Sequence, residues 1–205
     1  DAFGGISKAG NATHANAITV NGDYTNVYGG HTSGTSTTDV EKKNSYDNTV
    51  TITGGTIGNV YGGYTAADGT TNNNTVTLAG GTVTGTVSGG NRTAQGNTLN
   101  VNTAATVGKI ENFSKVTFKD KDAKLTLTGT GVKFNLASVN ADFAATAQKQ
   151  TLVESSNALD LADGKTFRSE LNADRTRETN IEASTDKKKI VRYGYTLKNA
   201  TTATT

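Results

Sequence analysis

Few side chains in this sequence could carry out acid–base chemistry or hold a metal ion. The sequence has two His, no Cys, and no Gly-x-Ser-x-Gly turn of the kind that presents a nucleophilic Ser. His14 precedes the first repeated segment and His31 lies in a long insert, so we interpret both as exposed loop residues. Because a zinc site uses three or four protein ligands, two isolated His predict neither a metal centre nor a bound cofactor.

Paired carboxylates are the other arrangement that could be catalytic, since glycoside-cleaving enzymes place an acidic group on each side of the bond. In the first half of the chain only Asp23 lies inside a repeated segment. The other acidic candidates fall in inserts, where solvated loop charge is the ordinary explanation: Asp39, Glu41, Asp47 and Asp68. We therefore expect a protein that is not an enzyme, with a polysaccharide-active enzyme as the alternative.

The elements that would position these residues are four copies of one segment. Each copy begins with Asn, alternates apolar and polar residues, turns, and continues with further apolar positions. The copies read NAITVNGDYTNVYGG, NTVTITGGTIGNVYGG, NTVTLAGGTVTGTVSGG and NTLNVNTAATVGKIENF, and they start at Asn16, Asn48, Asn74 and Asn97. The first three end in a Gly pair: Gly29 and Gly30, Gly62 and Gly63, Gly89 and Gly90.

Alternation with a period of two residues is typical of strands that bury one face. Repetition in one direction, with inserts of changing length between segments of nearly constant length, favours stacking of equivalent strands. The sequence thus predicts an all-β fold, a parallel β-helix (solenoid) of several short coils with a more irregular C-terminal β region. An antiparallel sandwich of similar hairpins is the alternative. The expected core comprises Ile18, Val20, Val27, Val50, Ile52, Ile57, Val60, Val76, Leu78, Val83, Val87, Leu99, Val101, Val107 and Ile110.

Two features of the repeat are expected at the corners of the coils. Gly pairs supply backbone angles that β-branched neighbours avoid. The aligned Asn is a common corner residue, and its side chain can bond nearby backbone or stack on the Asn of the next coil.

Beyond the fourth copy the pattern weakens. VTF, LTL and VKFNL predict further strands, residues 138–150 predict a short helix with Val139 and Phe143 on one face, and QTLVE, KTFRSEL, TNIEAS and KKIVRYGYTL predict more charged strands packed on the end of the column. We divide the chain into a repeat solenoid over 1–115, capping or continuing strands over 116–137, and a charged C-terminal β region with a tail over 138–205.

Charge is unevenly distributed, with 4 Lys/Arg and 6 Asp/Glu over residues 1–104 but 16 and 12 over residues 105–205. A nucleic-acid binder gathers an unopposed basic face, so this mixture predicts no nucleic-acid partner. No apolar run approaches the roughly 20 residues of a membrane helix, so we expect no membrane insertion of this portion. Because residue 1 is not Met, we expect that an upstream segment such as a secretion signal has been removed.

The segments NTVTITGGTIGNVYGGYT and NTVTLAGGTVTGTVSGG, followed by VGKIENFSKVTF, resemble the passenger regions of bacterial autotransporters, the type V secretion route. Such passengers are commonly right-handed parallel β-helices displayed outside the cell, so the resemblance implies an extracellular or bacterial cell-surface location. It rests on periodicity and composition, and this chain has few coils for that family. Because the family includes adhesins, proteases and self-associating proteins, the resemblance restricts location more than activity.

Two functions are then expected, and they are compatible. The first is adhesion to a host or neighbouring-cell surface ligand through the insert patch, defined as Asp39, Glu41, Lys42, Lys43 and Tyr46. The second is self-association head-to-tail into an oligomer or fibre, because a solenoid ends in unpaired strands and the chain has no Pro to block them. A basic cluster near the C-terminus either contacts an acidic polymer or protects an edge strand; it contains Lys187, Lys188, Lys189 and Arg192.

Overall fold

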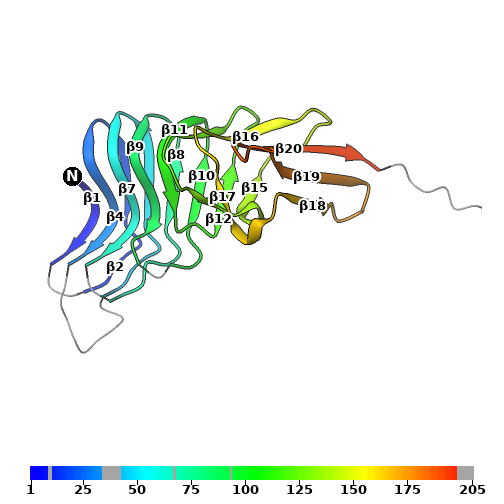
Figure 1. Ribbon diagram of the computed structural model, residues 1–205. Coiled ribbons are helices and arrows are strands. Elements are labelled where there is room, and N and C mark those ends of the chain that lie inside the picture. Colours follow the sequence, from blue (N-terminus) through cyan, green and yellow to red (C-terminus); the bar gives the residue numbers. More distant parts are fainter. Residues whose placement is uncertain (9–10, 34–42, 67, 93, 198–205) are drawn as a thin grey trace, which may run out of the picture.

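The computed structural model describes residues 1–8, 11–33, 43–66, 68–92 and 94–197, and nearly all of its regular structure is β. Two large sheets contain most of the strands. Figure 1 shows these strands following one another along an elongated molecule, from the N-terminus at the left to β18, β19 and β20 at the right. No helix in the described ranges is long and apolar enough to cross a membrane.

The ten-stranded sheet has the order β1 (Ala2–Ser7), β4 (Tyr24–Thr32), β7 (Thr56–Thr65), β9 (Thr82–Gly90), β11 (Ala104–Glu111), β13 (Lys124–Leu127), β16 (Gln150–Ser155), β20 (Lys189–Thr196), β19 (Arg177–Ala183) and β18 (Phe167–Leu171). The six-stranded sheet has the order β15 (Val139–Ala141), β12 (Lys115–Phe118), β10 (Thr98–Val101), β8 (Thr75–Leu78), β6 (Thr49–Gly54) and β3 (Ala17–Asn21). Two small parallel pairs join β2 (Thr13–His14) to β5 (Ser45–Tyr46) and β14 (Lys133–Phe134) to β17 (Asp160–Leu161). Two short 3-10 turns are η2 (Leu136–Ser138) and η3 (Ala162–Gly164).

The chain visits the two large sheets in turn, so each repeated segment contributes one strand to each sheet. We call such a pair of successive strands a rung; β3 with β4 and β6 with β7 are examples. Neighbouring rungs pair in parallel, with Ile18 opposite Val50, Val50 opposite Val76 and Val76 opposite Leu99. This is the register obtained by aligning the segments on Asn. The prediction of an all-β fold is confirmed, and the antiparallel sandwich is wrong for the repeats.

Inward side chains from both sheets form one apolar core. Every aliphatic residue predicted for the core is buried except Ile18, which is half-buried and packs against it. Equivalent positions lie directly above one another, as in the column of Val20, Ile52, Leu78 and Val101. The column continues into Phe118, which opposes Val101 and is fully buried.

A column of amides runs beside this apolar core. We call Asn16, Asn48, Asn74 and Asn97 the Asn ladder; the last three are 0% exposed. The Asn74 side-chain oxygen accepts hydrogen bonds from both the backbone N–H and the side-chain amide of Asn48, each at 3.0 Å. The Asn97 side-chain oxygen accepts from the backbone N–H of Asn74 at 2.7 Å, and the Asn48 side-chain oxygen accepts from the Asn16 side-chain amide at 2.8 Å. The expected stacking of Asn on Asn is therefore present.

The corner itself lies one residue before each Asn of the ladder. Ala15, Asp47, Asn73 and Gly96 all have positive φ, at 54°, 55°, 55° and 70°. A left-handed residue thus precedes the inward-pointing Asn in every rung, and three of the four residues are types that tolerate this conformation at low cost. Because the turn precedes the ladder, the Asn is a buried interior residue and not the corner residue that the sequence predicted.

The predicted corner position of the terminal Gly pairs is wrong. Gly29, Gly30, Gly62, Gly63, Gly89 and Gly90 lie within β4, β7 and β9, and none of them has positive φ. They are Gly because the backbone passes directly over the Asn ladder. A Cβ on Gly63 would lie 2.6 Å from the side-chain nitrogen of Asn74 and 2.6 Å from the carbonyl oxygen of Ser45. The requirement is for close approach and not for an unusual backbone angle.

Parallel pairing extends beyond the repeats to β16, which pairs in parallel with β13 on one side and antiparallel with β20 on the other. The helix predicted over 138–150 is absent from that range; η2 ends at Ser138 and β15 follows it at once. The reason is that Val139 pairs opposite Val116 and continues a second apolar column, which runs through Val76 and Leu99. This tertiary packing overrides the local helical spacing. The predicted tail, NATTATT at residues 199–205, lies outside the described residues.

Replacing Asn74 with Ala should lower the free energy of unfolding by about 2–4 kcal/mol. The change removes the acceptor for two donors of Asn48 and the side-chain amide donor to the Ser45 carbonyl. The Asn48 side-chain amide keeps its bonds to Thr13 and Ser45, whereas the Asn48 backbone N–H and the Ser45 carbonyl lose these partners inside the protein. Urea unfolding followed by circular dichroism measures the effect. Asn102→Ala is the matched control, because Asn102 follows β10 and is exposed; an equal loss in both variants would contradict a stabilising role for the ladder.

Candidate functional site

The residues on either side of each terminal Gly pair form a surface that the fold does not need for its core. In β4 the order is Val27 inward, Tyr28 outward, two buried Gly, then His31 outward. The consecutive buried Gly interrupt the simple alternation of a strand, so two outward side chains flank them. The same pattern recurs in β7 and in β1. We call the resulting set the aromatic face: Phe3, Ile6, Tyr28, His31, Tyr61 and Tyr64.

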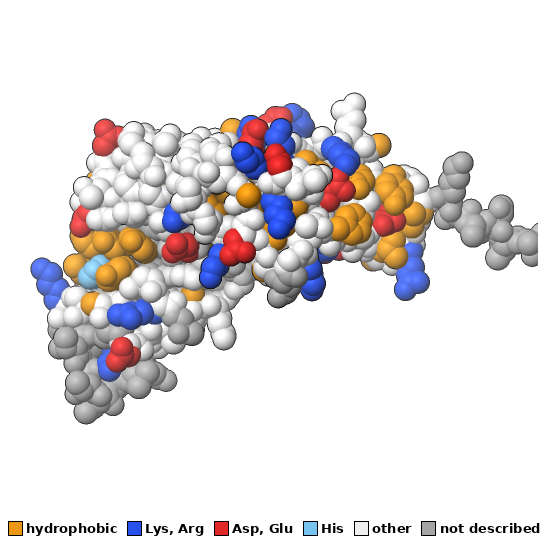
Figure 2. All heavy atoms as spheres, viewed as in Figure 1, with side chains coloured by type: hydrophobic (Ala, Val, Ile, Leu, Met, Phe, Trp, Pro, Cys, Tyr) orange, Lys and Arg blue, Asp and Glu red, His pale blue; other side chains and the backbone are white. Residues whose placement is uncertain are grey.

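The pairing register places these side chains in two columns. Phe3 opposes Tyr28 and Tyr28 opposes Tyr61 in the first column. Ile6 opposes His31 and His31 opposes Tyr64 in the second. At the next rung Tyr61 opposes Ser88, so the first aromatic column ends there. Figure 2 shows the face as a contiguous hydrophobic patch around a His side chain at the left of the molecule.

The rings stack along both columns. Centroids are 5.0 Å apart for Phe3 and Tyr28, 5.3 Å for Tyr28 and Tyr61, and 4.8 Å for His31 and Tyr64, with planes within 10° of parallel. Between columns the planes are nearly perpendicular, for example 89° for Tyr28 and His31. The His and Tyr rings are half-buried, so part of each ring remains exposed to solvent.

The polar atoms of the face have few protein partners. Within the described residues the hydroxyls of Tyr28, Tyr61 and Tyr64 make no hydrogen bond, and the Nδ1 atom of His31 is buried without one. Burial raises the pKa of Tyr28 and Tyr61, with smaller contributions from the neighbouring Tyr groups. Burial also lowers the pKa of the His31 imidazole. Near neutral pH the face is therefore an uncharged surface with free hydrogen-bonding groups.

Sequence reasoning found the segments that build this face but missed the face itself. The signal was present in VYGGHT and VYGGYT, which share an aromatic residue before the Gly pair and a ring after it. It was also present in AFGGIS at residues 2–7, a copy of the same strand that the alignment on Asn does not include. The interpretation of both His as loop residues is wrong, because His31 lies inside β4 and His14 lies in β2.

The predicted insert patch is only partly described. Asp39, Glu41 and Lys42 lie outside the described residues, and Lys43 is half-buried. Tyr46 lies in β5 and stacks on His14 of β2, with ring centroids 5.1 Å apart. The two His are therefore not brought together in one site: His14 pairs with Tyr46 on the small sheet, and His31 belongs to the aromatic face.

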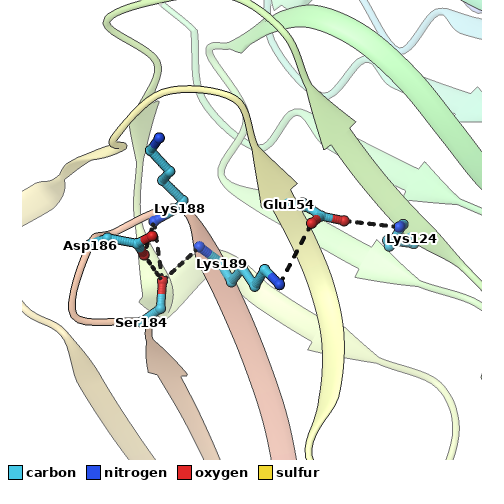
Figure 3. A network of polar contacts seen from close by, with 6 residues as sticks. All are labelled: Lys124, Glu154, Ser184, Asp186, Lys188 and Lys189. Atoms are coloured by element: carbon cyan, nitrogen blue, oxygen red, sulfur yellow. Dashed lines mark hydrogen bonds and ion pairs between the residues drawn. The ribbon is translucent and has the colours of Figure 1, made fainter.

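Two of the four residues of the C-terminal basic cluster, Lys189 and Arg192, contact other parts of the protein (Figure 3 shows Lys189). Lys189 contacts Glu154 at 3.6 Å, and Glu154 also binds Lys124 at 3.1 Å, which lowers the pKa of the Glu154 carboxyl. The Arg192 guanidinium donates to the Phe143 carbonyl at 3.0 Å and lies over the Phe143 ring.

The remaining two lysines, Lys187 and Lys188, are exposed in the hairpin that Ser184 and Asp186 close before β20. β20 itself lies between β16 and β19, so the interpretation of this segment as an edge strand is wrong.

The acidic residues of the early repeats are dispersed. Asp23 accepts a hydrogen bond from the backbone N–H of Thr56 at 2.7 Å, and Asp47 occupies a left-handed corner. A cleft of about 240 Å³ opens beside Phe113 and Lys133, and Glu111 is the one carboxylate in its described lining. No group of three or more potential metal ligands occurs within the described ranges.

Comparison with family models, curated proteins and solved structures gave no match. The function proposed below therefore rests on the geometry of the protein and on the pattern of its sequence.

Lowering the pH through the ordinary range of a His should destabilise the protein through His31. Because burial holds the pKa of folded His31 below about 6.5, the unfolded chain binds more protons in this range, and stability falls as pH falls. The titratable groups that face His31 are Tyr28 and Tyr64. We expect the urea midpoint of His31→Phe to change less between about pH 7 and about pH 5 than that of the unchanged protein. Equal changes would contradict this role.

Proposed function

We propose that this chain is a parallel β-helix module that acts outside a bacterial cell as an adhesive surface protein. The in-register parallel rungs, visited alternately in two sheets, support the β-helix. The resemblance of the repeated segments to autotransporter passengers supports the location. The activity proposed is binding of a surface ligand, without chemical conversion.

The observation that carries the proposal is the aromatic face. Soluble proteins rarely expose contiguous apolar patches unless the patch is an interaction site. Here Phe3 and Ile6 are 38% and 47% exposed, and the rings of Tyr28, Tyr61 and Tyr64 are half-buried beside them. Tyr is also a residue type that contributes strongly to binding, because it is rigid and amphipathic. The face stands on paired strands, so its side chains are fixed before a ligand arrives.

Replacing Tyr28, Tyr61 and Tyr64 together with Ser should abolish attachment to cells that bind the unchanged protein. The expected loss is at least about tenfold in bound protein, because several central aromatic contacts are removed at once. Fluorescently labelled protein and flow cytometry measure it. Tyr24→Ser is the matched control, since Tyr24 is an exposed Tyr on the same strand but outside the face.

The insert patch is tested in the same assay. A variant with Asp39, Glu41, Lys42 and Lys43 replaced by Ser should attach as well as the unchanged protein. If this variant loses attachment and the triple Tyr→Ser variant attaches normally, the binding site lies in the insert and not on the aromatic face.

A second part of the proposal is association of copies through the edges of the ten-stranded sheet. In the described chain β1 and β18 are those edges, and each carries two exposed large apolar residues: Phe3 and Ile6 on β1, Phe167 at 52% and Leu171 at 51% on β18. Exposed apolar edge strands tend to pair with another chain. If β1 of one copy pairs with β18 of the next, each copy still has one free edge, so further copies can add and form a filament.

Sedimentation velocity over a range of concentrations, with electron microscopy of the same samples, tests this association. Phe167→Lys with Leu171→Lys should shift the protein to monomer, because charged side chains on an edge strand disfavour its pairing with another chain. Tyr195→Lys is the control, since Tyr195 is 44% exposed but lies on the internal strand β20. Unchanged protein that stays monomeric at high concentration would contradict association.

A further inference from the structure

We infer that the aromatic face binds a neutral glycan chain laid across the rungs, with sugar C–H groups against the rings and sugar hydroxyls bonded to the phenols. This inference rests on the proposed adhesive function and names the ligand class of the same face. It is drawn from the free hydroxyls, the absence of charge in the face, and its size and repeat.

The tyrosines of the face differ from those elsewhere in how their hydroxyls are used. On β20 the Tyr193 hydroxyl contacts a Glu182 oxygen at 3.0 Å and the Tyr195 hydroxyl contacts a Glu178 oxygen at 2.9 Å. The three face hydroxyls have no such partner among the described residues, although their rings are held in place by stacking. A ligand that offers several hydroxyls can satisfy these groups, and a purely apolar ligand cannot.

The face itself carries no charge, which favours a neutral ligand over an acidic one. None of the six residues that define it is acidic or basic near neutral pH, since burial lowers the pKa of His31. The carboxylate of Glu111 acts on Tyr61 and helps to raise its pKa. Lys109 lies two residues before Glu111 on β11, so this margin has no excess of positive charge to attract a carboxylated or sulfated polymer.

The size of the face fits a small chain-like ligand. A stable protein–protein interface uses about 20–30 residues on each side, and this face has six. Its contacts recur at 5.0 Å and 5.3 Å along the first column, a step comparable to the length of one pyranose unit. A glycan of several units running from β1 to β7 can therefore repeat the same contact at each rung, which raises affinity as the chain lengthens.

Isothermal titration of the full chain with cellohexaose, maltohexaose and chitohexaose tests the inference, with oligogalacturonate as the acidic comparator. At least one neutral hexasaccharide should bind saturably, and the triple Tyr→Ser variant should lose at least about tenfold in affinity. The triple variant Tyr28→Phe, Tyr61→Phe, Tyr64→Phe keeps the stacked rings and should lose about threefold through the missing hydroxyls. Tyr24→Ser should bind like the unchanged protein, and urea midpoints verify that each variant is folded.

The inference is overturned if no neutral hexasaccharide binds, if the Tyr→Ser variant binds equally well, or if oligogalacturonate binds more tightly than all three. Cell attachment separates this failure from failure of the adhesive function. Periodate treatment of the cells, which cleaves sugar diols, should remove attachment, whereas protease treatment should leave it. The opposite pattern would keep the adhesive function and overturn the glycan. Attachment to no cell type would overturn the adhesive function, while the titration still decides whether the face binds a glycan.

Discussion

The structure depends on keeping a column of buried amides beside the apolar core. Each Asn of the ladder must have all of its hydrogen bonds made within the protein, because a buried amide without partners is costly. The partners are the next Asn and nearby carbonyl groups, for instance Ser45 for Asn74 and residue 71 for Asn97. These contacts exist only when equivalent rungs are in register. A slip of one residue would turn every Asn outward, so the ladder fixes the pairing of all the early strands.

The same constraint shapes the outer surface. Backbone must pass close over the amides, and only Gly leaves room for it there. The buried Gly pair breaks the alternation of the strand, and one outward residue is left on each side. Identical breaks in successive rungs bring Tyr28 over Tyr61 and His31 over Tyr64. The aromatic face is thus an external consequence of the internal ladder, which explains why its rings are so regularly spaced.

The sequence predicted the repeated part of the fold well because its signal is periodic. Alignment on the four Asn identified the register, and the aliphatic positions predicted for the core are buried or pack against it. It predicted less where tertiary packing decides. The sequence alone does not show whether a Gly pair is needed for a turn or for close approach of the backbone. The pairing of Val139 with Val116 likewise cannot be predicted from the spacing of nearby residues. Edge and central strands also look alike in sequence, so the lysines at and just before the start of β20 suggested an edge strand, whereas β20 is internal.

The aromatic face could have been predicted in part. Tyr28 and Tyr61 occupy the same place in aligned copies, so their proximity follows from the repeat. Phe3 was missed because no Asn-led segment stands before AFGGIS in this sequence, so the alignment on Asn did not include it. The perpendicular arrangement of the two columns is a product of side-chain packing. For the C-terminal basic cluster the sequence predicted a binding site that the contacts do not support. A run of basic residues suggested a site, but Arg192 and Lys189 contact other residues of the protein.

The left-handed residue before each ladder Asn has a consequence for how such a molecule can change over generations. Because every segment re-enters the stack through the same local turn, the path taken before that turn does not alter the strands that come after it. Loops of different length can be exchanged, and whole units can be duplicated or lost, while the flanking units keep their alignment. The number of units, and with it the reach of the molecule, can then vary without a new fold having to be found.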